Sequence, residues 1–395
     1  IINQEDEDSD IKKLYDTNYL IPYDFDEKAV RKLKYIEKVA GNVLYLVIHT
    51  TTDCNFRCQY CALDFEKKHM SLDTQEAVIS FVRKNIHKYS SVNIGWFGGE
   101  PLLQMDVIEN ISSRVIEICK KAHKSYAATI TTNGYLLTSK NIDKLISLKV
   151  LSYTVTLDGL KDIHDSMRVL KGGEATFEKL IHNLEYIRDN YKSRTIHITL
   201  RSNLTESILK RLDEYYEFFN SKFGDDSRFS LFVRPVGNWG GESVKKLSKT
   251  LIPYETMAEV YHGLAGYIDK ITFDGNFDDM QPGGSTCTAT YLNKFTIGVD
   301  GLVGKCDTAP NVSEAIGLLK GNGEMVLDQS KHAQWVTSCF DDNIQCEECT
   351  RSAICFRGCC IKAKIKDGVS ACGFSYNELD ALLHLYDQSY LVEII

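Results

Sequence analysis

The sequence predicts an α/β fold in which a partial (β/α)6 TIM-like barrel is followed by a small cysteine-rich domain. Three observations predict this class. From about residue 43 to 240, short apolar runs alternate with longer segments of helical period, as in parallel strands joined by right-handed helical crossovers. Polar motifs follow four successive strand candidates, and all cysteines beyond Cys119 lie between Cys287 and Cys372. Six repeats would leave the barrel open on one side for a large substrate.

Six runs rich in branched and aromatic residues are the predicted strands, because each has the length of a strand and is separated from the next by room for a helix. They are residues 43–48, 92–97, 127–131, 151–157, 195–200 and 229–233.

Two of the connecting helices have clear signals. After Pro101, apolar residues repeat at helical spacing and share one face, which Cys119 extends as a small buried hydrophobe; they are Val107, Ile108, Ile111, Val115 and Ile118. Another helix is expected to begin near Asp73, with Glu76 completing a capping box. Its expected buried residues are Ala77, Val78, Phe81 and Val82.

The polar motifs follow the carboxyl ends of the predicted strands. Residues 54–61 follow the first strand, 98–101 (GGEP) the second and 132–134 (TNG) the third, and 158–159 (DG) end the fourth. In barrel-like α/β folds this rim is the active-site face, so the four motifs are expected to form one site.

The stretch TTDCNFRCQYCALDF holds Cys54, Cys58 and Cys61 at C-x3-C-x2-C spacing. Three thiolates can bind one inorganic centre, but they leave a tetrahedral zinc site or an iron-sulfur cubane one ligand short. The residues between them supply no obvious fourth ligand. Two interpretations stay open, a zinc ion completed by a distant His and a cubane held through three of its irons.

This motif resembles that of the radical S-adenosylmethionine superfamily, in which an aromatic residue, here Tyr60, precedes the last cysteine. The GGEP stretch is similar to the superfamily loop that contacts the amino group of the bound methionine. The resemblance implies a 4Fe-4S cluster on the three cysteines, whose free iron binds S-adenosylmethionine and splits it to a 5′-deoxyadenosyl radical. The cofactor-binding residues that it implies are Tyr60, Gly98, Gly99, Glu100, Asn133, Thr156 and Arg168, with Arg201 as a weaker candidate. Alone, GGEP also fits a turn with Pro101 at the first helical position, and Asn133 and Thr156 also fit turn or cap positions.

The second cysteine group resembles the SPASM extension of this superfamily, which carries two auxiliary 4Fe-4S clusters. The resemblance implies Cys346, Cys349, Cys355 and Cys372 as ligands of one cluster and Cys287, Cys306 and Cys359 as ligands of the other. The cluster on Cys287, Cys306 and Cys359 again lacks one ligand. Either Cys339 or Cys360 supplies it, or one iron is open to a substrate thiolate. Of the two cysteines Cys339 is the better candidate, since Cys360 directly follows Cys359. Asp307 stands where related enzymes place a carboxylate near the substrate and is the candidate catalytic base. A zinc ribbon is the alternative for this region.

Together these resemblances imply a radical peptide maturase of the sactipeptide or ranthipeptide thioether synthase type. It would abstract a hydrogen from a ribosomally made precursor and join a cysteine sulfur to carbon, with reducing equivalents from a donor such as flavodoxin or ferredoxin. The alternatives are a carbon-carbon crosslinking cyclase, an anaerobic sulfatase maturase that forms formylglycine, and a zinc-stabilised peptide-binding module. The stretch 234–241 (RPVGNWGG) could line the channel with Trp239 or be a packed turn.

Composition limits the classes of binding partner and the cellular location that we expect. The formal net charge of −8 argues against nucleic acid as a partner, and no apolar run reaches the length of a membrane span. Thirteen cysteines without a secretory signal favour metal binding in the cytoplasm over disulfides, and the acidic stretch 4–10 is expected to be a solvated terminus. The predicted division is a lead-in over 1–42 with a possible partial leader-binding element, the barrel over 43–240, a bridge over 241–285, the SPASM domain over 286–375 and a C-terminal helix over 376–395.

Overall fold

The computed structural model describes two compact units of the chain. The described residues are 9–16, 20–61, 66–236, 252, 256–265, 286–308, 311–338, 349, 360–367, 381 and 384. One unit combines Ile1–Gly41, Asn276–Leu292 and Ala333–Gly373, and the other combines Asn42–Gly275, Asn293–His332 and Phe374–Ile395. The expected helix around residues 376–386 lies almost wholly outside the described residues, as do Trp239, Cys339, Cys346, Cys355, Cys359 and Cys372. Among the described residues, no helix has the length and apolarity that crossing a membrane requires.

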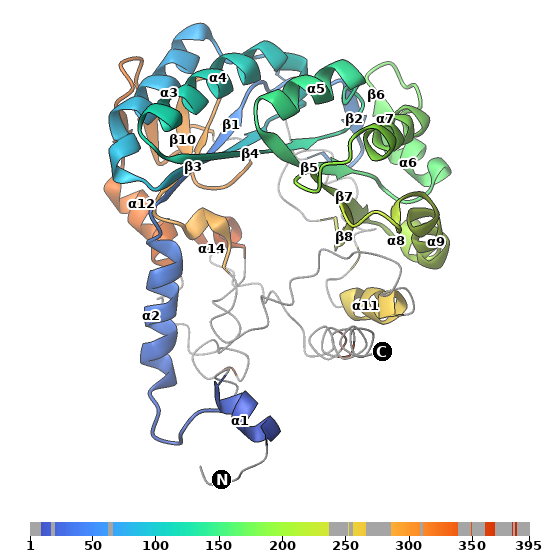
Figure 1. The fold of residues 1–395 in the computed structure, drawn as a ribbon, viewed down its shortest axis with the longest axis horizontal. Coiled ribbons are helices and arrows are strands. Elements are labelled where there is room, and N and C mark those ends of the chain that lie inside the picture. Colours follow the sequence, from blue (N-terminus) through green and yellow to red (C-terminus); the bar gives the residue numbers. More distant parts are fainter. Residues whose placement is uncertain are drawn as a thin grey trace. The chain divides into compact units, whose positions relative to one another are not determined.

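The six predicted strands are confirmed as the parallel part of one curved sheet in the second unit (Figure 1). Their order across the sheet is β1-β3-β4-β5-β7-β8, and every neighbouring pair is parallel. The strands are β1 (Val43–His49), β3 (Ser91–Phe97), β4 (Ser125–Thr132), β5 (Val150–Thr156), β7 (His197–Leu204) and β8 (Phe229–Pro235). All six therefore end at the same edge, where the polar motifs follow.

Four short strands extend the sheet beyond β1. Strand β9 (Lys294–Ile297) pairs parallel with β1, and β10 (Leu302–Gly304), β11 (Gly317–Leu319) and β12 (Met325–Leu327) follow in antiparallel order. These residues come after Cys287, in the stretch that the sequence assigns to the cysteine-rich domain. Strands of three or four residues carry too little periodicity to predict, so this extension becomes visible only in the structure.

Helices cover one face of the parallel sheet, the outer face in Figure 1. They are α3 (Leu72–Asn85), α4 (Met105–Lys121), α5 (Ser139–Ser147), α6 (Lys161–Met167), α7 (Phe177–Asn190), α8 (Glu206–Leu209) and α9 (Leu212–Phe223). Beyond β8, α11 (Met257–Ala265) packs on α9. In β7 and β8 the residues alternate between buried and half-buried, which places the buried set against the helices and leaves the half-buried set on the inner face.

The apolar face predicted for α4 is confirmed. Val107, Ile108, Ile111 and Val115 are buried, Ile118 is half-buried, and Cys119 is buried on the same face. The helix predicted to begin near Asp73 is confirmed as α3, but Ser71 rather than Asp73 is its N-cap, and the Ser71 hydroxyl accepts from Thr74 N. Glu76 forms an ion pair with Arg114 of α4, so the capping box does not form.

The other unit holds the described helices of the N-terminal region, α1 (Ser9–Asp16) and α2 (Glu27–Val39). Asp26 caps α2 by accepting from Ala29 N at 2.9 Å. On α2, Tyr35 packs with Tyr291 and Val336 and donates a hydrogen bond to Val336 O at 2.6 Å. Further elements are η5 (Thr288–Thr290) and α14 (Ile361–Asp367), while α12 (Gln329–Val336) crosses the boundary between the units.

Candidate active site

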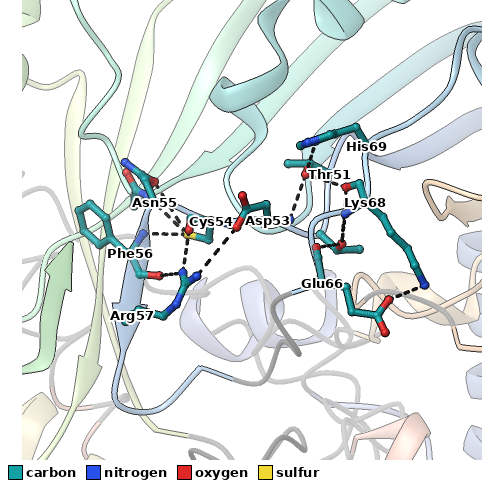
Figure 2. A network of polar contacts seen from close by, with 11 residues as sticks. Thr51, Asp53, Cys54, Asn55, Phe56, Arg57, Glu66, Lys68 and His69 are labelled. Carbon is teal, nitrogen blue, oxygen red and sulfur yellow. Dashed lines mark hydrogen bonds and ion pairs between the residues drawn. The ribbon is translucent and has the colours of Figure 1, made fainter. Parts of the chain in front are cut away.

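The three-cysteine loop is held at the carboxyl end of β1. Within it, β2 (Phe56–Cys58) pairs antiparallel with β6 (Arg168–Leu170), and this pairing sets Cys58 opposite Arg168. Before the cysteines, Thr51 forms a bridge with His69, and its hydroxyl donates to Lys68 O at 2.8 Å (Figure 2). The loop is thus fixed on both sides of Cys54 by backbone pairing, which the sequence did not predict.

Cys54 lies deepest of the three, 9% exposed. Its sulfur accepts from Phe56 N at 3.3 Å, and Arg57 donates to the Cys54 carbonyl at 2.7 Å (Figure 2). Burial raises the pKa of the Cys54 thiol to about 12, and the charges of Glu100 and the other two thiols add to the rise. Burial also raises the pKa of Cys58 to about 11, against the lowering effect of Arg168.

These raised pKa values mean that the apo thiols are protonated at neutral pH. A metal centre must displace their protons to bind, so its binding releases protons. Cys54 interacts electrostatically with both of the other thiols. Among the described residues, no three His, Cys, Asp or Glu side chains meet at the spacing of a single metal ion.

The loop after β3 packs its backbone directly on the segment that leads to Cys54. Gly99 N donates to Thr51 O and Glu100 N donates to Asp53 O, both at 2.9 Å. A Cβ on Gly98 would lie 2.4 Å from Thr51 O, and a Cβ on Gly99 would lie 2.0 Å from Asp53 O. Gly98 also has a φ of +130°, which side chains disfavour. Only glycine at both positions permits this contact, so the two predicted motifs form one structural block.

Glu100 is fully buried and joins the ends of β3 and β4. Its carboxylate accepts from Leu102 N at 3.1 Å, from the Thr132 hydroxyl at 2.7 Å and from Asn133 N at 2.8 Å. Burial raises the pKa of this carboxyl, and the hydrogen bonds oppose the rise. The first of these bonds caps η2 (Pro101–Gln104), so the predicted turn before a helix is present at this site as well.

Asn133 reaches the cysteine loop from the end of β4. Its side-chain amide donates to Asn55 Oδ1 at 2.8 Å and lies 3.8 Å from Cys54 Sγ. Thr156 ends β5, is 9% exposed and lies opposite Arg201 of β7 in the sheet register. The predicted residues Gly98, Gly99, Glu100, Asn133 and Thr156 therefore share the strand-end rim with the cysteine loop.

Tyr60 belongs to a buried polar network that sequence analysis did not assemble. Its hydroxyl donates to the Asp158 carboxylate and accepts from Arg168 at 2.6 Å and from the Asn203 side chain at 3.2 Å. Arg168 and Asp158 form an ion pair at 3.7 Å, with side chains 6% and 1% exposed. Asn203 N donates to Asp158 at 2.8 Å. The network ties the cysteine loop to the ends of β5 and β7.

The guanidinium of Arg168 contacts both the Tyr60 network and Phe56 of the cysteine loop. It lies 5.5 Å from the centre of the Phe56 ring, and its Nε is buried and has no hydrogen-bond partner among the described residues. Asp158 in DG and Asn203 near the end of β7 are polar residues at strand ends, and this position could have marked both as candidate site residues in the sequence. Pairing with Tyr60 depends on contacts about a hundred residues apart, which spacing cannot reveal.

The predicted ligands of the auxiliary clusters are only partly described. Cys306 and Asp307 follow β10 in the unit with the sheet, and Cys287 is an exposed residue of the other unit. Cys349 and Cys360 are half-buried. The remaining ligands lie outside the described residues, so the ligand sets stay predictions.

His49, the last residue of β1, is fully buried beside this rim, and we expect it to make stability depend on pH. Burial lowers its pKa from 6.5 to about 4, so between these values the unfolded chain binds the proton that the folded chain excludes. The free energy of unfolding should therefore fall as pH drops from about 6.5 to 4, by about 3 kcal/mol at most for this residue. Urea unfolding monitored by circular dichroism across this range measures it.

The matched variant is His49→Gln, whose side-chain amide has no proton to gain. It should flatten part of this dependence, while His164, whose pKa burial also lowers, keeps the rest. A pH dependence identical in both proteins would contradict the assignment.

The comparisons with known proteins agree with this geometry. Residues 48–215 match the model of the Radical SAM superfamily. The GTP 3′,8-cyclase of Clostridium perfringens is 25% identical over 294 residues, 68% of this chain and 82% of the relative. The cysteine-type anaerobic sulfatase-maturating enzyme of Clostridium novyi is 23% identical over 346 residues, 80% of this chain and 87% of the relative. An uncharacterized protein of Methanocaldococcus jannaschii is 27% identical over 177 residues, and there the chain spans only 57% of the relative's length.

Two solved structures share the fold. The structure titled native anSMEcpe with bound AdoMet and Cp18Cys peptide has a TM-score of 0.64 at 17% identity, covering 89% of this chain and 98% of that one. Streptococcus suis SuiB bound to precursor peptide SuiA has a TM-score of 0.57 at 18% identity, covering 93% of this chain and 86% of that one. Both agree with a mixed α/β fold built on a partial, barrel-like parallel sheet.

Proposed function

Because this chain carries a radical SAM domain, we propose that it is a peptide maturase that joins a cysteine sulfur to a carbon of a ribosomally made precursor. The observation that carries the proposal is the single rim on which the three-cysteine loop, the glycine pair and Asp307 come together. Precursor or substrate peptides are bound in two proteins of the same fold, which supports a peptide as the substrate.

The residues at the rim fit a 4Fe-4S cluster and S-adenosylmethionine. Cys54, Cys58 and Cys61 would hold three irons, and the backbone contact of Gly99 keeps their loop in place. A cluster held by these residues and reduced by a donor such as flavodoxin or ferredoxin would supply reductive cleavage of S-adenosylmethionine. Tyr60, Gly98, Glu100, Asn133, Thr156 and Arg168 are the residues proposed to position that cofactor.

Several of these residues would act through the chain rather than on the cofactor directly. The Glu100 carboxylate is occupied by three donors, so it would hold the ends of β3 and β4 in register around the site. The Tyr60 hydroxyl is occupied by Asp158, Arg168 and Asn203, so only its ring is left for stacking. The Arg168 guanidinium, whose buried Nε has no hydrogen-bond partner among the described residues, is the proposed donor to an anionic group such as the carboxylate of S-adenosylmethionine.

The inner face of β7 and β8 supports a peptide site. Phe232 lies between two guanidinium groups, with Arg201 5.7 Å and Arg234 5.1 Å from its ring centre. All three residues are half-buried, on the face opposite the helices. Cations held over an aromatic ring offer a peptide both carboxylate recognition and apolar contact.

The auxiliary clusters are the second part of the proposal. Cys346, Cys349, Cys355 and Cys372 would hold one, and Cys287, Cys306 and Cys359 the other, with Cys339 or a substrate thiolate on its last iron. Iron and acid-labile sulfide analysis tests this, since three cubanes require about twelve irons per chain. Zinc without sulfide would instead support a peptide-binding module and overturn the enzyme proposal. The cytoplasm is the proposed location, because such clusters need a reducing compartment.

The deciding experiment is incubation of the reduced protein with S-adenosylmethionine and a candidate cysteine-containing precursor peptide. A thioether product has lost two hydrogens and one titratable thiol. Loss of two hydrogens with every thiol retained would instead indicate a carbon-carbon crosslink. Formation of an aldehyde would indicate oxidation to formylglycine, the second candidate, which the match over 87% of the sulfatase-maturating relative favours.

A further inference from the structure

The segment that carries Asp307 is anchored at the end of β1. Strand β9, which begins at Lys294, lies beside β1, and Asp307 follows β10 on the other side of β9. This places the acidic residue next to His49, which directly precedes the segment leading to Cys54. The contacts around Asp307 show how it is held there.

Lys294 is a buried cation that uses all of its donors on this segment. Its side chain is 3% exposed, and the ammonium group donates to the Asp307 carboxylate, to Lys305 O and to Thr296 Oγ1, the last at 3.2 Å. An ammonium group has three donors, so each has a partner. The geometry of this group is fixed, because a buried charge that lost one of these contacts would be strongly destabilised.

His49 holds the same residue through its backbone. Nε2 lies 2.7 Å from Asp307 O, and burial lowers the pKa of the ring to about 4, so the imidazole is neutral and Nε2–H is the donor. Nδ1 is then an acceptor, and within the part of the chain that the structure describes it has no hydrogen-bond partner. The ring packs on Phe97 with centroids 5.3 Å apart, which fixes its plane.

The carboxylate of Asp307 is held on one side only. Its side chain is 51% exposed although its partner Lys294 is buried. The contacts recorded among the described residues go to Oδ1 and leave Oδ2 for an external group. If the Asp307 carboxylate served only to neutralise Lys294, the ion pair at Oδ1 would be sufficient. The hydrogen bond from His49 to the Asp307 carbonyl and the outward position of Oδ2 would then have no role.

We infer that Lys294 is a positioning residue, which together with His49 holds the Asp307 carboxylate at the rim with Oδ2 turned toward the substrate. This inference rests on the proposed function only for the identity of the substrate, a peptide, that contacts Asp307 Oδ2. The positioning itself is a property of the chain without any ligand.

The activity arm of the test compares Lys294→Met, Asp307→Asn and the double variant in the reconstituted enzyme with S-adenosylmethionine and the peptide. Lys294→Met should form deoxyadenosine at a rate within about twofold of wild type, but crosslinked peptide per deoxyadenosine should fall at least about tenfold, because small displacements of reacting groups cost that much. The double variant should be no worse than Asp307→Asn, and Lys294→Arg should recover part of the yield. An unchanged yield in Lys294→Met, or additive losses in the double variant, would overturn the inference.

The matched control is Arg228→Met. Arg228 is also a buried cation, 7% exposed and paired with Asp226, but it directly precedes β8, at the end of the strands opposite the rim. It should lower stability like Lys294→Met while leaving the yield per deoxyadenosine unchanged.

The exchange arm uses the chain without peptide or S-adenosylmethionine. Amide hydrogen exchange over residues 298–308 should be at least about tenfold faster in Lys294→Met than in wild type, and equal exchange would overturn the positioning role. If the wild-type enzyme forms deoxyadenosine but no crosslinked peptide, the proposed function fails, and the exchange arm still decides the inference.

Discussion

Replacement of Cys54 by alanine is expected to abolish deoxyadenosine formation and to lower the iron content by about four atoms per chain. Cys54 is the most buried of the three cysteines, and its sulfur accepts from Phe56 N inside a loop that is paired on both sides. Its removal leaves two thiols for a cubane that already lacks a fourth protein ligand. Iron and sulfide analysis together with chromatography of the reaction products measures both effects.

Cys119→Ala is the matched control for Cys54→Ala. Cys119 is also buried, but it packs on the apolar face of α4 and is not part of a cysteine motif. This variant should keep its full iron content and activity. Equal iron in the two variants would exclude Cys54 as a cluster ligand.

Gly99→Ala is expected to have the second largest effect, although it removes none of the predicted cluster ligands. The added methyl group would lie 2.0 Å from Asp53 O, a backbone atom that cannot move without shifting the cysteine loop. We expect a loss of stability of about 1–3 kcal/mol, as in other overpacked sites, and cluster loading reduced by more than half. Urea unfolding of the apo chain and iron analysis after reconstitution separate the two effects.

Gly321→Ala is the control for Gly99→Ala, because a Cβ at Gly321 meets nothing within 4 Å. It should leave both stability and iron content near their wild-type values. If Gly99→Ala behaved in the same way, the close contact between the glycine pair and the cysteine loop would be refuted.

The central strands and the rim could be predicted because their signals are local. Each parallel strand is a short apolar run, and the residues after it come to one edge of the sheet whatever the details of packing. The apolar face of α4 repeats over four turns, so one half-buried member, Ile118, does not obscure it. The error in the cap of α3 has a local cause, since Ser71 is as good a cap as Asp73 and Glu76 pairs with Arg114 instead.

What the sequence could not provide depends on contacts between distant segments. The ribbon of β2 and β6 is three residues long on each strand, and the network of Tyr60 joins four residues that lie far apart in the sequence. Lys294 reads in the sequence as an ordinary lysine at the start of a short apolar run. Only the pairing of β9 with β1 brings it to Asp307.

The most direct test of the whole account is product analysis of the wild-type chain, reconstituted with iron and sulfide without oxygen and supplied with S-adenosylmethionine, dithionite and its peptide. The account predicts 5′-deoxyadenosine and methionine in equal amounts, because one sulfonium bond is split in each event. Absence of deoxyadenosine from protein that carries its full iron and sulfide would contradict a radical site at Cys54, Cys58 and Cys61.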